Sequence, residues 1–152
     1  MDSRPIVVLA HVLAAFWWFA GYAGTNICTE IARRSTTDDD CRSAIVVSGR
    51  LDRLANRTGG TAVGLTGLLL VIVTGRAWTT PWILVSIVLF ATVVFGGIFL
   101  WERFGGGVEA AAAANDWPGV RRALNAPRVI AYGRLENVAV LAIIVLMVLG
   151  PG

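Results

Sequence analysis

The stretch IVVLAHVLAAFWWFAGYAGT, residues 6–25, contains no charged side chain and is long enough to cross a bilayer as a helix. About 20 apolar residues in an α-helix span the ~30 Å hydrocarbon layer. Three more apolar stretches of similar length lie at residues 58–75, 81–100 and 129–149. The sequence therefore predicts an all-α, four-helix transmembrane bundle that forms one domain over residues 1–152.

The positive charges are distributed very unevenly between the flanks of these stretches. All 13 positive residues are arginine: six lie between residues 33 and 57, five lie between residues 103 and 134, and only Arg4 and Arg76 lie elsewhere. Connections on the cytoplasmic side carry an excess of positive charge. We therefore expect both termini and the short second connection to lie outside, and the two long connections to lie in the cytoplasm.

The net charge of +3 points to lipid as the partner and not to nucleic acid, because the arginines flank the apolar stretches. They could also contact anionic lipid head groups. Cys28 and Cys41 fall on the predicted cytoplasmic side, where thiols stay reduced, and their spacing matches no metal motif. Two free thiols are predicted. A homodimer or a larger membrane complex is compatible with the sequence.

Helix boundaries are marked by proline and by polar residues. Pro5 suits a first helical turn, and the first helix is expected to continue to about Arg34. The threonines and aspartates that follow suit a helix N-terminus, which predicts a short helix over 38–48 leading into the second apolar stretch. In the third connection, GGG at 105–107 is followed by an alanine-rich run, so its middle could be helical but looks mobile. Residues 120–124 suit a short turn on the membrane surface.

His11 is the only histidine, and it lies in the outer part of the first apolar stretch. Helical spacing places Trp18 and Tyr22 on the same face. On a membrane-spanning helix, a row of side chains that can form hydrogen bonds normally faces the neighbouring helices and not the lipid. His11 could ligate haem iron or another metal ion. Alternatively, it makes one hydrogen bond to a neighbouring helix, which is the simpler interpretation for this residue alone.

Two charged residues, Arg134 and Glu136, interrupt the last apolar stretch. Glu136 lies about seven residues into it, and a charge at such depth costs about 2.5–3.5 kcal/mol on insertion scales. We expect Glu136 to be paired, protonated or in a wet cavity. Candidate partners are Arg57 and Arg103, while Glu102 could pair with Arg134. Such a buried polar cluster would clamp helices together, bind a head group or pass protons.

Gly60, Gly64 and Gly67 share one face of the second apolar stretch. Small residues allow two helices to approach closely, so helix packing is predicted for this face. A flat cofactor lying against the glycines is the alternative.

Two motifs in the first stretch, LAHV at 9–12 and FWWFAG at 16–21, resemble the first helix of small bacterial membrane proteins. These are the CopD-type copper-resistance proteins and the HemJ-type protoporphyrinogen oxidases. Near the end, IIVLMV at 143–148 looks most like a family known only as predicted bacterial integral membrane proteins of unknown function. The resemblance covers most of the chain loosely. It implies a bacterial cytoplasmic (inner) membrane location and a bundle of four or five helices.

The HemJ-type resemblance implies haem b as cofactor, and the CopD-type resemblance implies copper. His11 is the only ligand of these families that this sequence shares. A copper site would need more His, Met or Cys ligands than His11 and Met147. We therefore expect a haem-type site with His11 as the iron ligand and Trp18 and Tyr22 as lining, serving a redox or tetrapyrrole-related role. The alternatives are a non-enzymatic accessory or scaffold subunit, and a small proton-coupled transporter that uses Glu136. No particular reaction is predicted.

Overall fold

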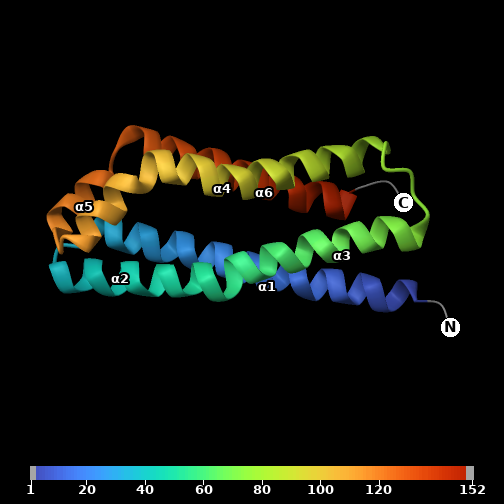
Figure 1. The fold of residues 1–152 in the computed structure, drawn as a ribbon, viewed down its shortest axis with the longest axis horizontal. Helices are drawn as coiled ribbons and strands as arrows, with labels where there is room; N and C mark the ends of the chain where they lie inside the picture. Colours follow the sequence, from blue (N-terminus) through green and yellow to red (C-terminus); the bar gives the residue numbers. More distant parts are fainter. Residues whose placement is uncertain (1–2, 150–152) are drawn as a thin grey trace. The chain divides into compact units, whose positions relative to one another are not determined.

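The computed structural model describes residues 3–149, without the side chains of Ile98, Leu100, Glu102 and Phe104. All regular structure in this part of the chain is helical, as Figure 1 shows, so the predicted all-α class is confirmed there. The elements in order are α1 (Arg4–Arg34), α2 (Asp38–Leu51), the π-helix η1 (Asp52–Arg57), α3 (Thr58–Thr74), α4 (Pro81–Ala113), α5 (Trp117–Leu124) and α6 (Pro127–Leu149).

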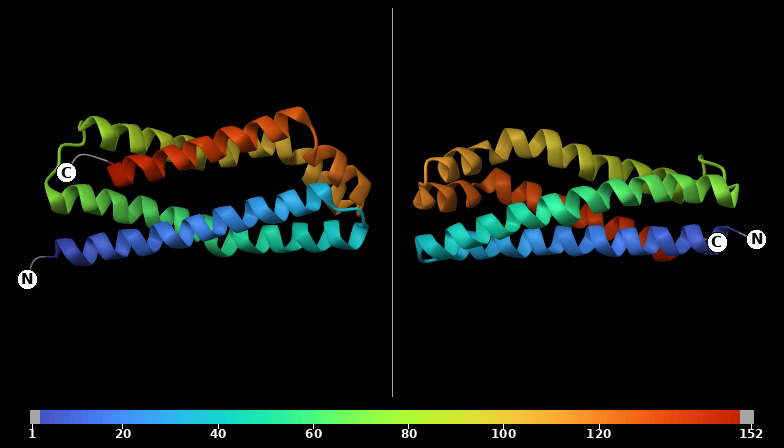
Figure 2. Two further views of the ribbon diagram at one scale, coloured as in Figure 1. Left: turned by 180° about the vertical axis from the view of Figure 1, so that it is seen from behind. Right: turned by 60° about the horizontal axis from the view of Figure 1, so that its bottom comes forward.

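The first of two compact units, Met1–Ala77, is a long helical hairpin. Its second arm is continuous, because α2, η1 and α3 follow one another without a break and together cover Asp38–Thr74. α1 contacts all three elements of this arm and lies beside it in each view of Figures 1 and 2. The hairpin therefore holds the side chains of α1 against residues distant in sequence.

The predicted ends of α1 and α2 are confirmed. α1 has proline in its first turn and ends at Arg34, where the backbone N–H of Ser35 donates to the Ala32 carbonyl. Thr37 is the N-cap of α2, and its hydroxyl accepts a hydrogen bond from the Asp40 N–H at 3.1 Å. A threonine cap followed by acidic residues stabilises the positive end of the helix dipole.

The sequence did not reveal the π-helix. The i→i+5 hydrogen bonds of a π-helix hold one more residue in a turn than the i→i+4 bonds of an α-helix. Asp52 stabilises this segment, because it accepts hydrogen bonds from the side chains of Asn56 at 2.9 Å and Arg57 at 2.7 Å. Ala55 of η1 packs against Gly21 of α1, so the irregular turn lies where the two arms approach closely.

The second compact unit, Trp78–Gly152, contains α4, α5 and α6, with α5 and α6 both packed on α4. The middle of the third connection is helical, since α4 continues through the glycines at 105–107 to Ala113, while its mobility stays a prediction. A Cβ on Gly105 would lie 2.5 Å from the indole of Trp101, one turn earlier. The missing side chain thus lets that indole lie along the helix, which offsets the poor helix propensity of glycine.

The predicted surface turn at 120–124 belongs to the two-turn helix α5. Asp116 caps it by accepting a hydrogen bond from the Gly119 N–H at 2.8 Å. Val120 and Leu124 lie one turn apart and are completely buried. Helices therefore form in both long connections, as expected, while their depth in a membrane stays a prediction.

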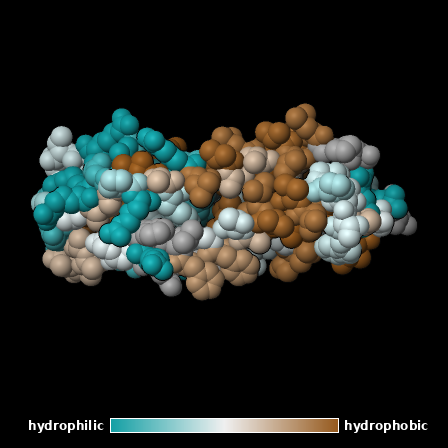
Figure 3. All heavy atoms as spheres, turned by 90° about the horizontal axis from the view of Figure 1, so that it is seen from above, coloured by the Kyte–Doolittle hydropathy of each residue, from teal (hydrophilic) through white to brown (hydrophobic). Residues whose placement is uncertain are grey.

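Three helical segments are long and apolar enough to cross a membrane, namely Arg4–Arg34, Asp38–Thr74 and Pro127–Leu149. The apolar section of α4, Pro81–Gly97, is shorter. Many large apolar side chains are exposed, such as Phe16 at 69%, as expected for a surface covered by lipid. In the face seen in Figure 3, hydrophobic residues gather over α4 and α6, and hydrophilic residues gather at the end formed by α5.

Candidate functional site around His11

The imidazole of His11 is bound to α3. Its Nδ1 lies 3.0 Å from the hydroxyl oxygen of Thr66. That hydroxyl donates its own proton to the carbonyl of Ala62, one turn earlier in α3, at 2.6 Å. Because a hydroxyl has one donor proton, we assign the Thr66 oxygen as the acceptor and place the proton on Nδ1 of His11. This hydrogen bond leaves the lone pair on Nε2, the other ring nitrogen.

Glycine brings the α3 backbone close to the imidazole. A Cβ added to Gly67 would lie 3.2 Å from Cε1 of His11, tighter than ordinary van der Waals contact. His11 is only partly buried by this contact. The ring is therefore held on one side by Gly67 and at Nδ1 by Thr66.

Trp18 and Tyr22 occupy the same face of α1, as helical spacing predicted, and both are buried. Their ring centroids are 6.2 Å apart with the planes tilted by 40°. A Cβ on Gly59 would lie 2.6 Å from the Trp18 backbone, and one on Gly60 would lie 3.5 Å from the indole nitrogen. The packing role predicted for the glycine face is thus confirmed at Gly60 and Gly67, where α1 itself covers the glycines.

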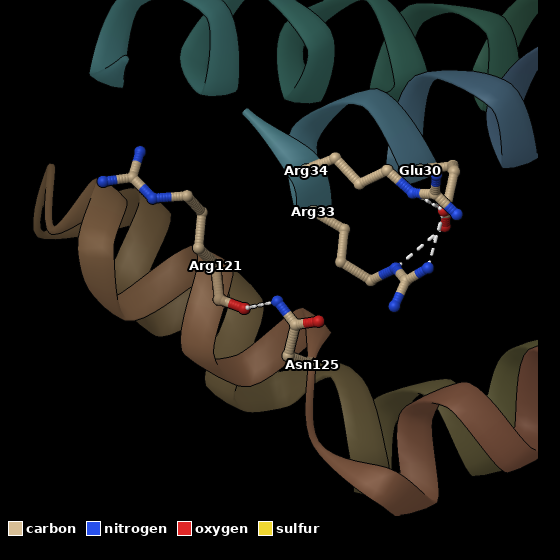
Figure 4. A network of polar contacts seen from close by, with 5 residues as sticks. All are labelled: Glu30, Arg33, Arg34, Arg121 and Asn125. Carbon is tan, nitrogen blue, oxygen red and sulfur yellow. Dashed lines mark hydrogen bonds and ion pairs between the residues drawn. The ribbon is translucent and has the colours of Figure 1, made fainter. Parts of the chain in front are cut away.

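A separate group of charges lies at the end of α1. The carboxylate of Glu30 pairs with Arg33, with a shortest contact of 2.6 Å, and with Arg34 (Figure 4). Glu30 therefore balances part of the arginine charge at the end of α1, which is the charge that predicts a cytoplasmic location for this end. Figure 4 also shows the end of α5, where the side-chain amide of Asn125 donates to the Arg121 carbonyl at 2.8 Å.

Glu136 of α6 faces α4. A Cβ on Gly97 would lie 4.0 Å from its Oε1, and the hydroxyl of Tyr132 donates a hydrogen bond to the same oxygen at 3.4 Å. Sequence reasoning missed Tyr132, although its spacing of four residues from Glu136 is the spacing at which helical side chains meet.

Arg57, Arg103 and Arg134 are the arginines predicted to surround Glu136. Arg57 forms an ion pair with Asp52 at 2.7 Å, and Arg103 and Arg134 are exposed. The side chain of Glu102 lies outside the described residues. Coupling within this buried polar cluster stays a prediction.

The described residues contain no group of three or more His, Cys, Asp or Glu side chains that could hold a metal ion. Both cysteines are free thiols in the structure; Cys28 is partly buried and Cys41 is 0% exposed. His11 is therefore the residue on which a single-ligand site would depend.

Helices of membrane-spanning length, covered with exposed apolar side chains, are what an integral membrane family requires. The family model described as "Predicted integral membrane protein (DUF2269)" matches residues 5–151. The chain belongs to this family. The match covers every described helix from its first or second residue. Neither the curated proteins nor the solved structures provide a match to this chain.

Proposed function

We propose that this integral membrane protein binds a haem-type cofactor through Nε2 of His11 and serves a redox or tetrapyrrole-related role. The observation that supports this is the hydrogen bond from Nδ1 of His11 to Thr66. Histidines that ligate metals usually donate their other ring N–H to a fixed acceptor, which sets the tautomer and orients the ring. His11 has this arrangement, and an imidazole is a common axial ligand of haem iron.

Haem bound there would supply one-electron chemistry. The protein residues would bind and orient it. Thr66 fixes the rotation of the imidazole, and Gly67 limits its movement towards α3. Trp18, about two turns from His11, acts as a positioning residue, because its packing on Gly59 and Gly60 of α3 sets the register between the two helices. Tyr22, one turn further, supports Trp18 through their ring contact.

An absorption spectrum of the protein purified from haem-replete cells tests this proposal. We expect a Soret band in the wild type and its loss in His11→Ala, with helix content by circular dichroism unchanged. His11→Met should retain some haem with an altered spectrum, because a thioether can also bind the iron. Equal haem binding by the wild type and His11→Ala would show that another residue is the ligand.

A non-enzymatic accessory or scaffold subunit is the second candidate. It is supported by the close packing at Gly59 and Gly67, where the candidate site residues themselves join α1 to α3. In that case His11 serves only as an interhelical hydrogen-bonding residue. A colourless wild type from haem-replete cells, together with a less stable His11→Ala, would favour this candidate over the first.

We also propose that α4 is a fourth span, with both termini outside and residues 26–57 and 102–128 in the cytoplasm of a bacterial cell. The apolar section Pro81–Gly97 is nearly long enough for a bilayer, and α4 continues for another 16 residues beyond it. The uneven distribution of arginine supports the orientation. Labelling of single cysteines in intact cells tests both the number of spans and the orientation.

A further inference from the structure

Three exposed arginines lie close together on the second arm of the helical hairpin, where α2 passes through η1 into α3 (Figure 1). Arg50, Arg53 and Arg57 fall within about 10 Å along the helix axis, and all three are exposed. Between residues 50 and 57 the only acidic residue is Asp52. Positive charge therefore exceeds negative charge on this part of the hairpin.

These arginines lie at the level where the uncharged part of α1 ends. A Cβ on Gly24 would lie 2.9 Å from Cδ1 of Leu51, so the end of the uncharged stretch 6–25 faces residue 51. Arg50 and Arg53 are on either side of Leu51 in the chain. In a bilayer, the end of an uncharged spanning stretch marks the boundary between hydrocarbon and head groups, which is where lipid phosphates lie.

Arg57 begins further along the arm, but its side chain reaches back towards the other two. The residue before it, Asn56, contacts α1 at Gly21, about one turn inside the uncharged stretch. Nε of Arg57 donates to Oδ2 of Asp52, five residues earlier, at 2.7 Å, and the Arg57 side chain is 76% exposed. Asp52 therefore holds this guanidinium near the level of Arg53, in the way that long cationic side chains at helix ends bend towards the membrane surface.

Most of the guanidinium N–H groups of this cluster are available to an external ligand. The side chains of Arg50 and Arg53 make no ion pair or hydrogen bond within the described part of the chain, and Arg57 uses only its Nε in this way. A planar guanidinium group binds phosphate through two parallel N–H···O hydrogen bonds. The cluster therefore has the chemistry of a phosphate site.

Apolar side chains lie beside the arginines on the same exposed surface. The indole N–H of Trp17, a residue that is 54% exposed, donates at 3.1 Å to the hydroxyl of Thr58, which follows Arg57 in the chain. Leu54, next to Arg53, is 67% exposed. Indole rings are enriched at membrane–water interfaces. Cationic groups beside exposed apolar groups match both parts of a phospholipid, whereas a free phosphate ion would need only the cationic part.

We propose that Arg50, Arg53 and Arg57 bind the phosphate of an anionic phospholipid whose acyl chains lie over Trp17 and Leu54. The excess of positive charge favours a lipid with a net negative charge over a zwitterionic lipid, because the head group of the latter adds a further cation. All five residues belong to the first compact unit, and the lipid site does not depend on haem binding.

Competition between two lipids, followed by native mass spectrometry of the full-length protein in detergent, tests the proposal. From an equimolar mixture of dioleoylphosphatidylglycerol and dioleoylphosphatidylcholine, the wild type should retain phosphatidylglycerol preferentially. Arg50→Gln and Arg53→Gln should each lower this preference about five-fold, the usual contribution of one arginine near an anionic lipid surface. Arg42→Gln is the matched control, because Arg42 is exposed on the same arm but lies about 12 Å from Arg50 along the axis.

Two results of this competition would overturn the proposal. One is the absence of any preference in the wild type. The other is an equal loss of preference in Arg42→Gln and Arg53→Gln, because the protein would then respond to its total charge and not through a local site. Glycerophosphoglycerol, the same head group without acyl chains, should not displace the lipid. Its displacement of the lipid at equal concentration would show a site for soluble phosphates instead.

Photo-crosslinking of the wild type gives an answer even if the variants fail to fold, which circular dichroism would reveal. The protein is placed in phosphatidylcholine vesicles that contain phosphatidylglycerol with a photoreactive group near its glycerol backbone. Peptide mapping should find the adduct on residues 50–58 or on Trp17. Adducts confined to other segments would contradict the proposal.

Discussion

The hydrogen bond between His11 and Thr66 can be tested separately from the histidine itself. Thr66→Val keeps the shape of the side chain but removes the acceptor for Nδ1–H. If His11 ligates haem, we expect haem affinity to fall about 10–100-fold, the usual effect of losing such a supporting contact. Thr61→Val is the matched control, because the Thr61 hydroxyl donates only to the Arg57 carbonyl of its own helix. Haem titration followed at the Soret band measures both variants.

Gly59 allows the close approach of α1 and α3, and a methyl group there should separate them. In Gly59→Ala the new Cβ would lie 2.6 Å from the Trp18 backbone, which cannot move without shifting the helix. We expect destabilisation of about 1–3 kcal/mol, typical of overpacking. Gly49→Ala is the control, since nothing lies within 4 Å of its added Cβ. Unfolding in mixed detergent should show Gly49→Ala at or above wild-type stability, and equal stability of the two variants would contradict this packing.

The face that His11 shares with Trp18 and Tyr22 could be predicted from the sequence, because helical periodicity is a local property. The partner of His11 could not be predicted. It depends on the register between α1 and α3, which is set by contacts at Gly21 and Gly59, distant in sequence from each other. Long-range register of this kind leaves no local signal.

At the scale of helices, caps were predictable and irregularities were not. Thr37 and the aspartates after it fix the start of α2 through side-chain chemistry that the sequence displays. The π-helix η1 looks like ordinary helix in sequence, since one extra residue in a turn changes no residue type. The helical course of α4 through 105–107 depends on where the indole of Trp101 lies, which composition cannot show.

The π-helix predicts an unusual tolerance to deletion. Removing the exposed Leu54 should convert η1 into regular α-helix and preserve the faces of α2 and α3, because the segment holds one residue more than an α-helical turn. Leu65 of α3 is similarly exposed. Its removal should rotate the residues before position 65 relative to those after it and move Thr66 away from His11. Thermal unfolding followed by circular dichroism compares the two deletions. A less stable Leu54 deletion would mean that η1 is required as it stands.

The topology of the whole chain can be measured with single cysteines. The native thiols are poor reporters, because Cys41 is completely buried, so both are first replaced by serine or alanine. Thr79→Cys, Thr36→Cys and Ala114→Cys place thiols at exposed positions in three different connections. In intact cells, a membrane-impermeant maleimide should label Thr79→Cys only, and the other two should react only after lysis.

The Ala114→Cys variant decides whether α4 crosses the membrane. Labelling of Ala114→Cys together with Thr79→Cys in intact cells would place both ends of α4 on one side and reduce the spans to three. Labelling of Thr36→Cys and Ala114→Cys, but not of Thr79→Cys, would reverse the orientation. Charge asymmetry makes the orientation predictable from sequence, whereas the number of spans depends on the insertion of a helix whose apolar section is near the lower limit.

The length of α1 has a consequence for the kind of bilayer that suits this protein. Its exposed apolar surface continues past residue 25 through Ile27 and Ile31, which are 60% and 52% exposed. From Ile6 to Ile31 that surface is about 38 Å long, while an average hydrocarbon core is about 30 Å thick. This hydrophobic mismatch makes α1 tilt or thickens the lipid around it. We expect longer acyl chains to let α1 stand more upright, which would change the angle of His11 to the membrane.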